Sequence, residues 1–195
     1  MPDGKAGGAP EMTRRGSAPP GHYTRTAVAL HWLIALLITA GFTLGTTMTD
    51  LAVSPRKLRW YAYHKWIGIT VLGLVVLRVL WRARHAPPPD EPMPHWQRLA
   101  AHLTHGLLYL LMIATPVVGW LYSSAAGYPV VYLKLWRLPD LVAKDAALAK
   151  VLVQAHGLLA WTLMLLVLLH AAAALKHHFI DRDATLRRIL RWRTP

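Results

Sequence analysis

The sequence predicts an all-α integral membrane protein, built as a single four-helix bundle. The 195 residues are 54% hydrophobic and have a positive mean hydropathy of +0.30, yet the chain has a formal charge of +13. Long apolar blocks bounded by basic edges are typical of membrane proteins. Apart from Arg78, four stretches have close to the ~20 apolar residues that a helix needs to cross a bilayer: residues 27–48, 60–81, 99–122 and 151–175.

Polar and proline-rich segments indicate where each helix ends. We expect the first helix from about Thr26 to Met48, followed by a short turn at Ser54-Pro55, and the second from about residue 58 to 82. The run HAPPPDEPMPH has too many prolines to be helical and predicts a loop. The third helix is expected from about residue 95 to a loop at 123–147, and the fourth from about residue 150 past His177.

The two ends of the chain have different compositions. Residues 1–22 are rich in Gly, Pro and Ala, and no apolar segment follows Arg14-Arg15, so we expect a disordered tail rather than a cleaved signal. Residues 23–182 would form the bundle, and residues 183–195 a basic C-terminal segment. No internal repeat is evident in the sequence.

The distribution of Lys and Arg predicts the orientation in the membrane. The two termini and the loop between the second and third helices carry 14 of the 22 basic residues, and the two opposite connections carry the other 8. Because the more basic side usually stays in the cytoplasm, both termini should be cytoplasmic, in a bacterial inner membrane. The opposite, outer side is less basic but still positive.

Four histidines lie at two depths of the predicted bundle. His31 and His170 are close to the inner ends of the first and fourth helices, whereas His64 and His156 are close to the outer ends of the second and fourth. The step from His156 to His170 corresponds to ~21 Å along a helix and returns to nearly the same helix face. Both imidazoles should therefore point into the bundle.

Two layers of paired histidines indicate two haem groups. The chain has no cysteine, which excludes iron-sulfur clusters and covalently attached c-type haem. We therefore predict two haem b, one ligated by His31 with His170 and the other by His64 with His156. A single histidine near a helix end is more often an interfacial polar residue, but four intramembrane imidazoles are costly unless each has a partner.

Other polar residues near the inner side have two possible roles each. Arg78 is interpreted as an ion pair with an inner haem propionate, or as a side chain that extends to the lipid headgroups. His102 and His105 would contact propionates or quinone, or lie at the interface. His177 follows His170 on the same face and would bind a quinone headgroup or end a solvated helix, while His178 is rotated away.

Five segments resemble motifs of the bacterial cytochrome b561 family, including its superoxide oxidase type: YTRTAVALHWLIA, YHKWIG, LAAHLTHGLLYLLMIATPVVGW, QAHGLLA and LLHAAAALKHHF. The resemblance covers residues 22–193. It implies that His31, His64, His156 and His170 ligate two haems b and that the inner end of the last helix meets ubiquinone. His177 is then the expected quinone contact.

With imidazole on both sides of each iron, no position is open for oxygen, so the expected activity is electron transfer. The first interpretation is an oxidoreductase that oxidises superoxide at the periplasmic face and reduces ubiquinone. The basic residues near His64 would then attract the anion: Arg56, Lys57, Arg59 and Lys65. The second is a haem-bearing subunit that relays electrons between the quinone pool and a partner dehydrogenase or periplasmic protein, with a docking surface around Trp136. The third, a histidine-lined metal transporter, is disfavoured because the spans have no carboxylates. No nucleic-acid partner is expected.

Overall fold

A computed structural model describes residues 22–190 and contains four long helices, as predicted. They are α1 (Arg25–Thr49), α2 (Pro55–Arg84), α3 (His95–Ala125) and α4 (Ala146–Lys176). Each begins or ends within a few residues of the expected position. All four are long and apolar enough to cross a membrane. The tail expected at residues 1–22 lies, except for its last residue, outside the described residues, as do residues 191–195.

Side-chain caps explain three of the four helix starts. The Thr24 hydroxyl accepts a hydrogen bond from the backbone N–H of Ala27 at the start of α1. The Ser54 hydroxyl accepts one from the backbone N–H of Lys57 at the start of α2. The Asp145 carboxylate accepts hydrogen bonds from the backbone N–H groups of Ala147 and Leu148 at the start of α4. Such caps pair backbone N–H groups that have no partner within the helix.

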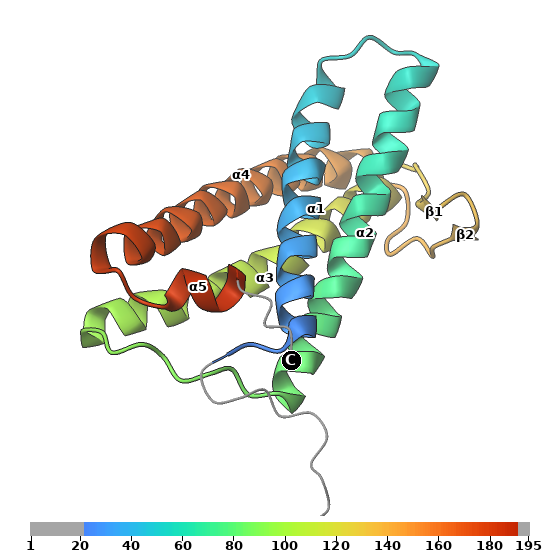
Figure 1. The fold of residues 1–195 in the computed structure, drawn as a ribbon. Coiled ribbons are helices and arrows are strands. Elements are labelled where there is room, and N and C mark those ends of the chain that lie inside the picture. Colours follow the sequence, from blue (N-terminus) through green and yellow to red (C-terminus); the bar gives the residue numbers. More distant parts are fainter. Residues whose placement is uncertain (1–21, 191–195) are drawn as a thin grey trace, which may run out of the picture.

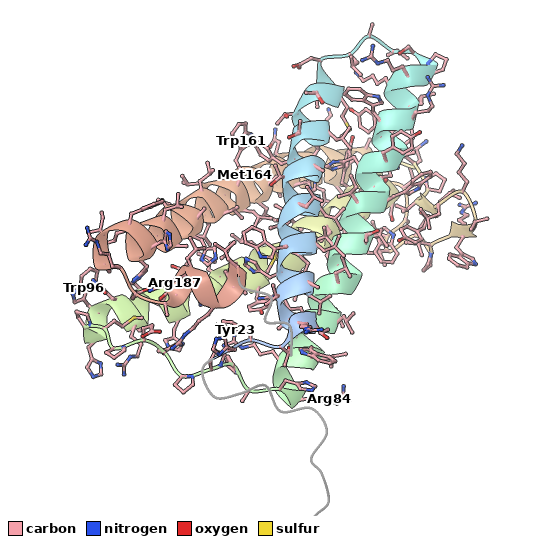
Figure 2. The ribbon with its side chains drawn as sticks, in the orientation of Figure 1. Tyr23, Arg84, Trp96, Trp161, Met164 and Arg187 are labelled. Atoms are coloured by element: carbon pink, nitrogen blue, oxygen red, sulfur yellow. The ribbon has the colours of Figure 1, made fainter. Side chains whose placement is uncertain are left out.

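The helices are arranged as two hairpins that cross each other (Figure 1). Helices α1 and α2 run side by side and form one hairpin, and α3 and α4 form the other. The hairpins meet mainly between α2 and α3. Trp161 and Met164 of α4 lie where this helix passes α1 (Figure 2), and the Trp161 ring packs edge-on against Phe42 with centroids 4.8 Å apart.

The apolar core is located between the two predicted histidine layers. Its buried members come from all four helices: Ile34, Val71, Val75, Leu108, Leu111, Met112 and Leu163. In every helix these residues fall between the predicted levels of the two histidine layers. Many large apolar side chains on the outside of the bundle are exposed, among them Leu36 and Leu158 at 66% and 70%. This is the pattern of a bundle whose outer surface faces lipid.

Three connecting or terminal segments have structure that the sequence did not predict. The loop after α3 contains a short antiparallel hairpin, β1 (Val131–Tyr132) paired with β2 (Trp136–Arg137). Helix α4 was expected to continue past His177, but the α-helix ends at Lys176 and one wider turn, η1 (His177–Asp181), follows. Beyond it, α5 (Thr185–Leu190) packs back towards α4.

Candidate functional site

His64 and His156 face each other across the bundle, and we call them the distal pair because they lie away from the chain termini. Their ring centroids are 5.9 Å apart and the rings are nearly perpendicular. The Nδ1 atom of His64 lies 2.9 Å from the carbonyl oxygen of Gly41, and that of His156 lies 3.0 Å from the carbonyl oxygen of Thr115. A carbonyl can only accept, so both Nδ1 atoms carry the proton and both Nε2 atoms are free to bind a metal.

Glycines make room for the distal pair. A Cβ atom at Gly45 would lie 3.0 Å from Cε1 of His64, and one at Gly119 would lie 2.8 Å from Cε1 of His156. Both histidines also line a cavity of about 400 Å³ with mostly apolar walls. The Thr115 hydroxyl lies at this cavity and is buried without a hydrogen-bond partner among the described residues.

His31 and His170 form a second pair, the terminal pair, on the side of the chain ends. Their ring centroids are 6.3 Å apart. Within the described part of the chain, none of the ring nitrogens of His31 and His170 contacts a backbone carbonyl. Instead, Nδ1 of His31 lies 3.4 Å from a guanidinium nitrogen of Arg78. Trp32 packs edge-on against His31 and donates its indole N–H to the carbonyl oxygen of Ile189, which links α1 to α5 beside this pair.

The spacing of both pairs fits one six-coordinate iron each. Imidazole nitrogens bind metals at ~2 Å, so two rings on opposite sides of one ion have centroids roughly 6 Å apart. Both observed separations agree with this value. The distal cavity is apolar, with glycines where the imidazoles press against neighbouring helices, as expected around a flat hydrophobic macrocycle. The donor set of neutral imidazoles suits haem iron.

Arg78, the one charged residue deep in a predicted span, extends from α2 and is held by contacts with two other helices. Its side chain donates to the carbonyl oxygen of Ala27 in α1 at 2.7 Å and to the hydroxyl of Tyr109 in α3 at 3.1 Å. Together with the approach to His31, these contacts fix the position of the guanidinium group between α1 and α3.

His105 is closer to the terminal pair than the sequence indicated. Its ring centroid lies 5.2 Å from that of His170, whereas His102, one turn earlier, is exposed and pairs with Asp90 at 3.3 Å. The two histidines, considered together as one candidate pair, therefore have different environments. The signal that separates them is the spacing to Thr115, described next.

The two hairpins share a pattern that was not evident in the sequence. In each, a carbonyl and a glycine one turn later hold the histidine of the following helix: Gly41 and Gly45 for His64, Thr115 and Gly119 for His156. The interval from His31 to Gly41 equals that from His105 to Thr115, and the interval from His64 to Arg78 equals that from His156 to His170. The hairpins thus match in register, with Arg78 at the position that corresponds to His170.

His177 lies in a network of charged groups at the end of α4. Its Nδ1 atom is 2.7 Å from a carboxylate oxygen of Asp183 and 3.1 Å from one of Asp181, which also pairs with Lys176. Burial raises the pKa of the Asp183 carboxyl, but hydrogen bonds from Thr185 and His177 outweigh it, so the net pKa is below the usual range. The Asp183 carboxyl group is therefore ionised, and as a carboxylate it accepts a hydrogen bond from the His177 ring. His178 contacts Phe179 instead.

The four basic residues expected to guide an anion differ in position. Lys65 lines the distal cavity beside His64, and its ammonium group donates to the carbonyl oxygen of Tyr128 at 3.0 Å. Lys57 donates to the carbonyl oxygens of Thr49, the last residue of α1, and of Leu51 in the following turn, and the Arg56 guanidinium lies 5.1 Å from the Trp60 ring centroid. Of the four, Lys65 is the cation in the cavity wall.

The chain is similar to known bacterial cytochromes over almost its whole length. It matches the family of prokaryotic cytochrome b561 at residues 22–192. It is 38% identical to cytochrome b561 homolog 2 of Escherichia coli strain K12, covering 88% of this chain and 92% of that protein. It is 31% identical both to the probable superoxide oxidase CybB of Yersinia pestis, over 86% and 95% of the two chains, and to cytochrome b562 of Cereibacter sphaeroides, over 87% and 95%. With two facing histidine pairs in a bundle of four membrane-length helices, the chain belongs to the prokaryotic cytochrome b561 family of haem b-binding membrane electron-transfer proteins.

Proposed function

We propose that this protein is a dihaem b-type cytochrome that oxidises superoxide at the periplasmic face of the bacterial inner membrane and reduces ubiquinone on the cytoplasmic side. The observation that carries the proposal is the presence of two histidine pairs at two depths, each with the ring separation that suits one iron. The similarity to a probable superoxide oxidase supports the choice of donor. The excess of basic residues at the termini favours cytoplasmic termini, which makes the distal pair periplasmic.

Each histidine pair would hold one haem b, His64 with His156 and His31 with His170. Haem held by two imidazoles supplies reversible one-electron transfer and leaves no position for an oxygen ligand. The protein's own residues fix the ligands: the carbonyls of Gly41 and Thr115 orient the distal rings, and the apolar core between the pairs keeps water out of the bundle.

Superoxide would approach the distal cavity. Lys65 lies in its wall, and Arg56 and Lys57 lie nearer the turn between α1 and α2. A positive approach raises the encounter rate of a small anion, and added salt weakens it because exposed charges are screened beyond ~8 Å at physiological ionic strength.

Ubiquinone would be reduced near His177. Two superoxide anions each lose one electron and become dioxygen, and ubiquinone takes up these two electrons with two protons to become ubiquinol. His177 is suited to pass a proton because Asp183 holds its Nδ1 side and the opposite Nε2 remains available for the quinone oxygen.

Rapid mixing of the purified, oxidised protein with superoxide tests this function. Spectra should record fast reduction of haem, at a rate that falls as salt is raised. Lys65→Gln should lower that rate several-fold with haem content unchanged, and neutralising Arg56, Lys57 and Arg59 together should lower it less. Slow, salt-insensitive reduction in the intact protein would rule out superoxide as the donor.

A second candidate function is an electron relay to a docked redox protein. The observation that favours it is the exposed β-hairpin surface after α3, where Trp136 is 63% exposed and Leu135 71%. In that case superoxide would react slowly, and Trp136→Ala would impair reduction by the partner while leaving both haems bound.

A further inference from the structure

We propose that Arg78 makes the terminal haem the one of higher reduction potential, so that the electron moves energetically downhill from the distal pair to the terminal pair. The inference rests on the proposed two-haem function and deepens it, because it assigns a direction to the transfer. It follows from the different groups that contact the ligand histidines in the two layers.

Both distal histidines make a hydrogen bond of the kind that lowers the reduction potential of the haem they would bind. His64 and His156 each donate Nδ1–H to a backbone carbonyl, at 2.9 and 3.0 Å. Such a bond makes the opposite nitrogen more basic and a stronger ligand for the more positive, oxidised iron. The distal site therefore favours the ferric state.

Within residues 22–190, neither His31 nor His170 has such a carbonyl contact. The group nearest Nδ1 of His31 is the Arg78 guanidinium at 3.4 Å, which has five N–H donors and no acceptor. The guanidinium cannot accept a hydrogen bond from the imidazole, and it places a permanent positive charge beside His31. Because the ferrous state carries one positive charge fewer than the ferric state, a nearby cation favours reduction.

The charge of Arg78 is fixed in place. Its other nitrogens donate to the carbonyl oxygen of Ala27 and to the hydroxyl of Tyr109, both uncharged groups. No carboxylate of the protein pairs with this guanidinium among residues 22–190, so no neighbouring Asp or Glu neutralises its charge. A half-buried charge is also screened less by salt than an exposed one.

The correspondence between the hairpins locates the asymmetry at this residue. In the distal layer the matching positions, His64 and His156, are the same residue type with the same kind of carbonyl contact. In the terminal layer the position matching His170 is Arg78. The two halves thus differ in charge at the depth where the electron would arrive. One electron leaves the reduced distal site and enters the oxidised terminal site, with no other reactant.

Equilibrium redox titration of the purified full-length protein, followed by its haem spectrum, tests the proposal. Variants that retain one haem assign the two potentials: His31→Ala for the distal haem and His156→Ala for the terminal one. The terminal haem should have the higher potential. In Arg78→Gln its ratio of reduced to oxidised haem at a fixed ambient potential should fall at least ~10-fold, equivalent to ~59 mV for one electron. The distal ratio should stay within about two-fold.

Two further variants keep the test decisive if Arg78→Gln binds the terminal haem poorly. Arg78→Lys retains the charge and should keep the terminal potential higher, and Tyr109→Phe, which frees one side of the guanidinium, should lower it partially. A distal potential equal to or above the terminal one in the single-haem variants would overturn the proposal, as would an Arg78→Gln protein with two haems and unchanged potentials. Loss of the two-haem function itself would appear separately, as fewer than two haems b in the unmodified protein.

Discussion

The distal and terminal histidine pairs present the same two rings at nearly the same separation, 5.9 and 6.3 Å, but different parts of the protein hold them. Backbone carbonyls and glycines of the adjacent helix hold the distal rings. Side chains surround the terminal rings, with Arg78 and Trp32 beside His31 and His105 beside His170.

This difference indicates that the two histidine pairs depend on different features of the protein around them. Backbone contacts fix the tautomer and orientation of the distal rings through helix packing alone, which substitution of a neighbouring polar side chain would not change. Side-chain contacts at the terminal pair can be replaced one at a time, so the charge near these two histidines is set by single residues. The distal site is therefore expected to depend on space, and the terminal site on charge.

The largest expected effect is the selective loss of one haem. Replacing His156 by Ala should remove the distal haem, and replacing His170 by Ala the terminal one, because a single imidazole retains haem poorly in an otherwise apolar site. Quantitation as the pyridine haemochrome should fall from about two haems per chain to about one in each variant.

His102→Ala is the matched control for this loss, since His102 is also a histidine of the bundle but is exposed and paired with Asp90. It should retain both haems. Unchanged haem content in His156→Ala would contradict the assignment of the distal pair.

A smaller effect should follow when the space beside the distal ring is reduced. Gly119→Ala would place Cβ 2.8 Å from the His156 ring, so the ring must move and the distal haem should be bound less completely, by roughly half. In most helices the same change is stabilising by about 1 kcal/mol. Gly73→Ala is the control, because nothing lies within 4 Å of its Cβ position. Equal haem content and equal distal spectra in the two variants would show that close packing against Gly119 is unimportant.

The smallest effect concerns the charged network at the end of α4. Asp183→Asn should retain both haems but slow electron exchange with a ubiquinone analogue a few-fold, because the amide holds the His177 ring less firmly; His177→Ala should slow it more. Since the pKa of Asp183 is lowered in the folded protein, its contribution to stability is present above the ordinary value of 3.8 and is lost as the pH falls through the lowered value.

Stopped-flow measurement of haem reoxidation by the analogue gives the rates, and thermal unfolding as a function of pH gives the stability. Lys176→Gln, which affects Asp181 rather than Asp183, serves as the control with little change in rate. Identical quinone kinetics in Asp183→Asn, His177→Ala and the unmodified protein would remove His177 from the proposed quinone site.

The four spans and the depth of each histidine could be predicted from the sequence, because apolar length and helical rise depend only on the local order of residues. The same reasoning missed the β-hairpin after α3: its turn uses Leu133 and Lys134 with positive φ values of 51° and 62°, where Gly or Asn is usual. It also missed the wider turn η1 and the helix α5, whose positions depend on contacts with α4 and with Trp32.

What surrounds each histidine was decided only by the tertiary structure. The carbonyl of Thr115 reaches His156, and Arg78 reaches His31, because the two helices of each hairpin pack in a particular register, and these partners are far apart in the sequence. Spacing along one helix predicts which face a residue occupies, but not which atom of another helix lies opposite. The sequence by itself therefore determined the four candidate ligand histidines and their two layers, whereas the packing of neighbouring helices decided the hydrogen bonds and charge that distinguish the layers.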